Sequence, residues 1–97
     1  MKFNNQAMNQ TVDELIVELR EELIKQLNLE GMLPEGFDEN TPLFGEGLGL
    51  DSIDSLELVV LLDRNYGIKL KDPKEGRHVF QSIRTMAEYI AKNRTQV

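Results

Sequence analysis

The most informative stretch of the sequence is Gly47-Leu48-Gly49-Leu50-Asp51-Ser52-Ile53-Asp54-Ser55-Leu56-Glu57-Leu58, in which a glycine-rich turn leads into a helix. A serine at the first position of a helix exposes its hydroxyl beside unpaired backbone amides and the positive end of the helix dipole. A phosphodiester formed on Ser52 would be favoured there. The alternative is that Asp51 or Ser52 is only an N-cap, which is the usual role of such residues before a helix.

The helix that begins at Ser52 carries two apolar stripes. It should run to Tyr66 and end at Gly67, where a left-handed cap residue is expected. At about 100° per residue, one stripe suits a core and the other faces away from it. An exposed apolar row among charged side chains indicates a docking surface, whereas a helix buried on both sides is less favourable in so short a chain. The core stripe is Leu58, Val59, Leu62 and Tyr66, and the second stripe is Ile53, Leu56 and Val60, interleaved with Glu57 and Arg64.

The residues before this motif predict a helix followed by a long loop. Thr11-Val12-Asp13-Glu14 has capping-box spacing, and a helix of about five turns should follow. Glycines and prolines punctuate the next stretch, and loops this long are usually functional or docked. Residues 1–10 have no periodicity and are expected to form a flexible lead. The apolar face of the helix is Val12, Leu15, Ile16, Leu19, Leu23 and Leu27, and the loop should be pinned by Leu33, Phe37, Leu43, Phe44 and Leu48.

The C-terminal third predicts a short helix and a longer one. Asp72-Pro73 reads as an N-cap with a first-turn proline, so the short helix should cover Pro73 to Val79 or Phe80. Ser82 should cap the last helix. The predicted fold is therefore all-α, with three longer helices, a short third helix and a long loop between the first two. One domain is expected over 11–93, followed by a tail at 94–97. The buried face of the last helix should be Ile83, Met86, Ala87 and Ile90.

Composition excludes several classes of function. The chain has 97 residues, a formal charge of -6 and no cysteine, so disulfides and a cysteine nucleophile are excluded. The charge opposes binding to nucleic acid, and no run approaches the roughly 20 apolar residues of a membrane span. A cytoplasmic monomer is expected. Residues 1–50 carry ten acidic and three basic side chains, whereas 67–97 carry three acidic and seven basic ones, so the acidic face should attract basic partners.

No catalytic or metal site is predicted. Ser52 lacks the Gly-x-Ser-x-Gly context of the α/β-hydrolases, and a helical chain with one histidine offers little support for a triad. Asp51, Asp54 and Glu57 recur at helical spacing and lack the pattern of a calcium loop. The lone His78 is assigned no role.

Residues 48–58, Leu-Gly-Leu-Asp-Ser-Ile-Asp-Ser-Leu-Glu-Leu, resemble the signature of acyl carrier proteins, and the likeness extends from Leu15 to Ile90. The resemblance implies an acyl-carrier-like four-helix bundle that performs no chemistry of its own. It also implies a 4'-phosphopantetheine arm, transferred from coenzyme A to Ser52, that carries acyl groups as thioesters. An apolar interior should admit the acyl chain.

The resemblance also implies partners. These are a phosphopantetheinyl transferase (holo-acyl-carrier-protein synthase) and the acyl-transferring and ketoacyl synthase enzymes of fatty-acid, lipid or related acyl biosynthesis. The residues expected to contact them are Asp51, Ile53, Asp54, Leu56, Glu57, Val60, Asp63 and Arg64.

Departures from the family pattern predict a specialised carrier. Arg64 stands where fatty-acid carriers usually have an acidic residue, although Asp63 keeps its acidic position. The segment 69–84 is basic and somewhat longer than in the common fatty-acid form. Two alternatives stay open: a peptidyl or aminoacyl carrier of a synthetase pathway, and an unmodified four-helix adaptor.

Overall fold

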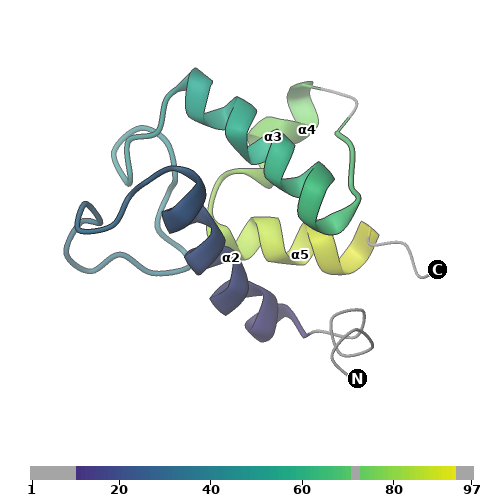
Figure 1. The fold of residues 1–97 in the computed structure, drawn as a ribbon, viewed down its shortest axis with the longest axis horizontal. Helices are drawn as coiled ribbons and strands as arrows, with labels where there is room; N and C mark the ends of the chain where they lie inside the picture. Colours follow the sequence, from purple (N-terminus) through teal and green to yellow (C-terminus); the bar gives the residue numbers. More distant parts are fainter. Residues whose placement is uncertain (1–10, 71–72, 94–97) are drawn as a thin grey trace.

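The computed structural model describes residues 11–70 and 73–93, and within these residues it contains four α-helices (Figure 1). They are α2 (Val12–Gln26), α3 (Ser52–Tyr66), α4 (Pro73–Val79) and α5 (Ile83–Asn93). The predicted all-α fold, with a short third helix and a long loop between α2 and α3, is confirmed. The predicted flexible lead, the Asp72 cap and the tail at 94–97 lie outside the described residues.

Local capping signals place the helix ends where the sequence predicts them. The Thr11 hydroxyl accepts a hydrogen bond from the Glu14 amide at 3.1 Å, and the Glu14 carboxylate accepts one from the Thr11 amide at 3.0 Å. Gly67 ends α3 in the left-handed region, with φ of 67°. The Ser82 hydroxyl accepts from the Thr85 amide at the start of α5. Helix α2 is about one turn shorter than the five turns expected, because the chain leaves the helix at Leu27 and Asn28 adopts φ of 58°.

The core forms where one face of each longer helix meets the others. Leucines of α2 pack against α5, whose four predicted core residues are all buried. In α3 the prediction is correct for Leu58, Leu62 and Tyr66, but Val59 is only half-buried and Leu61 takes a core position instead. Leu58, Leu61 and Leu62 occupy adjoining positions on one helical face, so the buried stripe is turned slightly from the expected direction.

The loop at 27–51 is docked on the molecule, as predicted. The Leu43 amide donates to the Gln81 carbonyl at 2.9 Å, and the Arg84 amide donates to the Glu39 carbonyl at 2.9 Å. The Arg84 side chain forms an ion pair with Glu39 at 3.3 Å and donates to Asn40 at 3.0 Å. These four contacts join the loop to the start of α5. Of the predicted pinning residues, Leu43 is fully buried, and Leu33, Phe37, Phe44 and Leu48 are half-buried.

A tight backbone contact shapes the end of this loop. The Leu48 amide donates to the Pro42 carbonyl at 2.9 Å, and a β-carbon on Gly47 would lie 1.9 Å from the same carbonyl oxygen. No side chain fits there. Gly49 adopts φ of 81°, after which the Leu50 amide donates to the Leu43 carbonyl at 3.0 Å. The chain therefore enters α3 from a fixed, closely packed turn.

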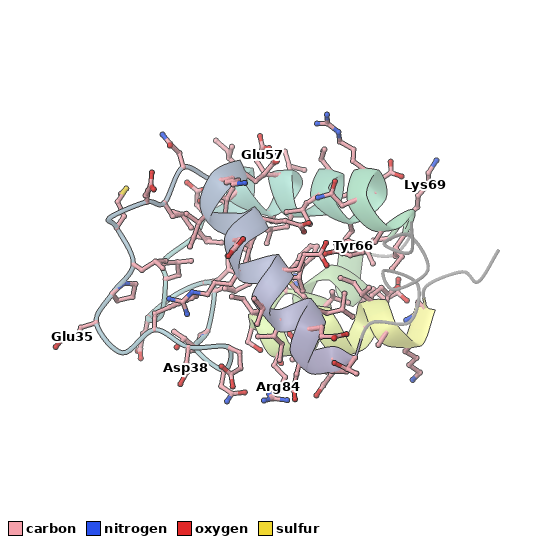
Figure 2. The ribbon with its side chains drawn as sticks, turned by 60° about the horizontal axis from the view of Figure 1, so that its bottom comes forward. Glu35, Asp38, Glu57, Tyr66, Lys69 and Arg84 are labelled. Carbon is pink, nitrogen blue, oxygen red and sulfur yellow. The ribbon has the colours of Figure 1, made fainter. Side chains whose placement is uncertain are left out.

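Side-chain hydrogen bonds join α2 to α3. The Tyr66 hydroxyl donates to Glu22 at 2.9 Å, and the Gln26 amide donates to Glu57 at 2.7 Å. Figure 2 shows Tyr66 directed into the space between the helices, and Glu57 in the N-terminal half of α3, which the loop enters. Burial raises the pKa of Glu22, with a further contribution from nearby Glu18, while the hydrogen bond from Tyr66 opposes the rise.

The raised pKa of Glu22 has a testable consequence for stability. The folded state binds the Glu22 proton more tightly than the unfolded state, so ionising this carboxyl disfavours folding, and the penalty disappears as the pH falls through the folded pKa towards 4.5. Glu22→Gln keeps an oxygen acceptor for Tyr66 and removes the charge. We expect it to raise the free energy of unfolding at pH 7 by about 0.5 kcal/mol, with the gain shrinking towards pH 4.5.

Urea unfolding of both proteins between pH 4.5 and 7.5 would measure this effect. Glu21→Gln is the matched control, because Glu21 is the exposed neighbour on the same helix. A gain of the same size from both substitutions would assign the effect to net charge rather than to Glu22.

Candidate functional site

Ser52 is the first residue of α3, and its side chain is exposed. The buried Leu50 fixes the chain two residues earlier, and the buried Leu58 holds the helix further along. The Ser52 hydroxyl makes no hydrogen bond to any group in the described residues, whereas the Ser52 carbonyl accepts from the Ser55 hydroxyl at 2.7 Å. The Ser52 hydroxyl is therefore held at the surface and is accessible to an enzyme that would modify it.

The amides around Ser52 are largely paired, which corrects one expectation. The Asp51 carboxylate accepts from the amides of Ile53 and Asp54, each at 3.0 Å, and the Asp54 carboxylate accepts from the Asp51 amide at 3.1 Å. This reciprocal capping box occupies donors that were expected to be free for a phosphodiester. A phosphate on Ser52 would lie beside two carboxylates, and the helix dipole would favour it only in part. Asp51 is thus the N-cap of α3.

The second apolar stripe of α3 is exposed, as predicted. Ile53 is 68% exposed, Leu56 64% and Val60 40%, which excludes the alternative of a helix buried on both sides. These three side chains and the acidic residues near them, Asp54, Glu57 and Asp63, are called the exposed face of α3. The sign of the charge changes along α3, from the acidic Asp54 in its first turn to the basic Arg64 in its last.

The remaining predicted contact residues differ in exposure and in how far hydrogen bonds within the protein engage them. Asp63 and Arg64 are exposed at the C-terminal end of α3. Glu57 is half-buried and bound to Gln26, so its carboxylate is partly committed to holding α2 against α3. Asp54 is half-buried within the capping box. The structure therefore leaves the three apolar side chains, Asp63 and Arg64 as the most accessible part of the predicted set.

Two further exposed apolar side chains were not predicted. Met32 is 68% exposed in the loop shortly after α2, and Val17 is exposed on the outer side of α2. The sequence signal for Met32 is an apolar residue between glycine and a proline-containing turn. Val17 departs from the polar pattern of the outer face of its helix, where Asp13 and Glu21 lie one turn away on either side.

A cavity of about 440 Å³ lies where the loop meets the turn between α4 and α5. It is at the surface, apart from the interior site that the sequence predicts for an acyl chain, and that interior site stays a prediction. The lining residues come from the loop, from α4 and from the α4–α5 turn: Asn40, Pro42, Phe44, Arg77, Phe80, Gln81 and Ser82. Sequence reasoning missed this cavity because its two walls lie more than thirty residues apart along the chain.

Residues 11–70 and 73–93 contain no group of three or more histidine or acidic side chains that could hold a metal ion. Within the same residues, every helix is too short or too polar to cross a bilayer.

Comparison with known proteins supplies the chemistry that this geometry leaves open. The family model described as a phosphopantetheine attachment site matches residues 17–90. An acyl carrier protein of Wolinella succinogenes is 31% identical over 77 residues, covering 79% of this chain and 93% of that protein. An acyl carrier protein of Brachyspira hyodysenteriae is 29% identical over 80 residues, covering 82% and 96%. One from Treponema denticola is 40% identical over 47 residues, covering 48% and 58%. No solved structure gave a significant match.

Proposed function

This chain belongs to the acyl carrier protein family, whose members are carriers rather than enzymes and bear a covalent 4'-phosphopantetheine, and we propose that Ser52 is the residue that bears it here. The observation that carries this proposal is the exposed Ser52 hydroxyl at the start of α3, two residues after the buried Leu50. Both residues lie inside the matched range 17–90.

The residues around Ser52 fit such an arm in a specific way. When attached, the arm supplies a thiol for thioester formation, which the chain cannot provide because it has no cysteine. Asp51 and Asp54 hold the first turn of α3 through the capping box, so that the modified hydroxyl has a fixed position. Gly47 and Gly49 hold the chain that leads to it.

Acyl carrier proteins are served by a phosphopantetheinyl transferase and by acyl-handling enzymes in general, and the exposed face of α3 is the proposed docking surface for them. Ile53, Leu56 and Val60 would form its apolar centre, and Asp63 with the acidic residues near Ser52 its polar rim. Acidic rims favour basic partners and speed their encounter. Asp51, Asp54 and Glu57 contribute charge to this surface while making their structural hydrogen bonds.

The finer features of the function are part of the same proposal. The partners would include ketoacyl synthases and acyltransferases of fatty-acid, lipid or related acyl biosynthesis, and the protein would act in the cytoplasm as a monomer. The carrier domain would span 11–93, which encloses the family match over 17–90. A peptidyl or aminoacyl carrier, or an unmodified adaptor, is the competing assignment.

Loading of the purified protein tests the proposal. The full chain is incubated with coenzyme A, Mg²⁺ and a broad-specificity phosphopantetheinyl transferase, and intact-mass and peptide mass spectrometry locate the product. We expect one phosphopantetheine per chain, on the peptide that contains Ser52. An unmodified chain after treatment with several such transferases would favour the adaptor assignment.

A second test concerns the proposed specialisation. Arg64 is exposed in the last turn of α3, where a positive charge weakens the attraction of basic partners. Housekeeping fatty-acid synthase enzymes should therefore use the holo-protein poorly, and Arg64→Glu should raise the apparent rate about threefold. Added salt should shrink the difference, because it screens exposed charges. Steady-state elongation assays at low and high salt would measure both effects.

The specialisation would be disproved by one plain result. If the unaltered holo-protein supports elongation by a reconstituted synthase as well as that system's own carrier does, Arg64 does not restrict its partners. Asp63→Glu is a suitable control for changes at the adjacent position that leave the charge unaltered.

A further inference from the structure

The cavity between the loop and the α4–α5 turn has an uneven chemical lining. Its apolar lining residues are Pro42, Phe44 and Phe80, of which Phe80 is almost fully buried. Its polar lining residues are the cationic Arg77, the amide-bearing Asn40 and Gln81, and Ser82. Among the described residues, none that lines the cavity carries a carboxylate, although the whole chain has a formal charge of -6. A cavity lined by apolar residues, a cation and amide-bearing residues suits an organic anion.

Arg77 is available to such a ligand. Its side chain is exposed and forms no ion pair with any residue in 11–70 or 73–93. Asn40 also lines the cavity, and its side-chain oxygen accepts from Arg84 Nε, which leaves the side-chain nitrogen as a donor. In Figure 2, Arg84 lies close to the part of the loop that carries Asp38, so these contacts hold the loop beside α5.

The cavity also lies within reach of a group tethered to Ser52. Phe44 is bridged to Leu50, which stands two residues before Ser52. Two steps along the chain and one step between bridged backbones separate Ser52 from Phe44 by at most about 12 Å. The free end of a phosphopantetheine arm on Ser52 can cover that distance. A carboxylate on the cargo, at the free end of the arm, could therefore reach Arg77.

We propose that this cavity receives the distal end of the carried acyl group and favours acyl groups that end in a carboxylate, with Arg77 as the recognising residue. The inference rests on the proposed loading of Ser52. None of the lining residues comes from α3, so the site is separate from the exposed face of α3 on which partner enzymes would dock. At about 440 Å³ it lies towards the small end of ligand cavities, which suits a short acyl group better than a long one.

Two acyl groups of equal length provide the test. The full chain, labelled with ¹⁵N, is loaded with either a glutaryl or a pentanoyl thioester, and backbone and arginine Nε resonances are compared. We expect the glutaryl form to shift the signals of Arg77, Gln81 and Phe44, and the pentanoyl form to shift them much less. Arg77→Gln should abolish the difference, and Lys69→Gln should preserve it, because Lys69 is an exposed cation outside the cavity.

Diffusible probes separate this inference from the loading of Ser52. Glutaryl and pentanoyl thioesters of N-acetylcysteamine are titrated into the unmodified chain, where glutaryl should bind roughly fivefold more tightly and Arg77→Gln should remove that preference. Equal shifts from both acyl groups would overturn the recognition of a carboxylate. Absence of shifts at the cavity with every probe would overturn the cargo site itself. Failure to load Ser52, with a preserved glutaryl preference in the titration, would count against the proposed function alone.

Discussion

Replacing Ser52 by alanine is expected to abolish the loading of phosphopantetheine, because the hydroxyl oxygen that would form the phosphodiester is removed. Little else should change in the folded protein. The N-cap is Asp51 and not Ser52, and alanine is well accommodated in the first turn of a helix. Mass spectrometry after treatment with coenzyme A and transferase should show no mass gain in Ser52→Ala, and its urea unfolding midpoint should match that of the wild type.

Ser55→Ala is the matched control. Ser55 is one turn away in the same motif, and its hydroxyl donates to the Ser52 carbonyl at 2.7 Å. A carrier modified at Ser52 should still accept one arm when Ser55 is replaced. Loading of Ser52→Ala together with loss of loading in Ser55→Ala would move the attachment site to Ser55.

Leu62→Ala is expected to lower the free energy of unfolding by roughly 2 to 5 kcal/mol, because it leaves a cavity in a closely packed core. The Leu62 side chain is 0% exposed and lies on the buried stripe of α3 with Leu58 and Leu61. Ile53→Ala and Val60→Ala remove apolar groups from the same helix on its exposed side, and each should cost less than about 1 kcal/mol. Chemical unfolding of the three variants measures the contrast.

The same variants should show the reverse order in function. Ile53→Ala and Val60→Ala should impair acyl transfer by partner enzymes at a temperature where both variants are folded, since an apolar centre contributes much of the binding energy of a docking surface. If all three variants are equally destabilised, the two faces of α3 have been assigned wrongly. If transfer is unaffected by Ile53→Ala and Val60→Ala, docking occurs elsewhere on the molecule.

The elements of this fold were predictable because their signals are local. The capping box of Thr11, the glycine stop at Gly67 and the cap at Ser82 each depend on residues within one helical turn. The exposed stripe of α3 was predictable for the same reason, since helical periodicity assigns faces from the sequence itself. Val59 was predicted to be buried, but Leu61 is buried instead. Both residues stand near the edge of that stripe, where the packing of α2 and α5 decides which side chain is buried.

Features that join distant residues could not be predicted in this way. The bond between Gln26 and Glu57, the contacts of Arg84 with Glu39 and Asn40, and the cavity beside Arg77 all depend on how the loop lies on the folded helices. In the candidate site, the exposure of Ser52 followed from its position at a helix start. The pairing of its neighbouring amides by Asp51 did not enter that prediction, although acidic residues three positions apart are compatible with reciprocal capping.

The capping box at the start of α3 also bears on how cargo is delivered. Because Asp51 and Asp54 occupy each other's backbone donors, a phosphate on Ser52 finds few local groups to hold it, and the carboxylates repel it. The arm would then behave as a free tether. A tethered thioester has an effective concentration set by the length of its linker, which reaches the millimolar range for short flexible linkers. Once an enzyme docks on α3, its active site would meet the acyl group at that concentration, however dilute the carrier is in solution.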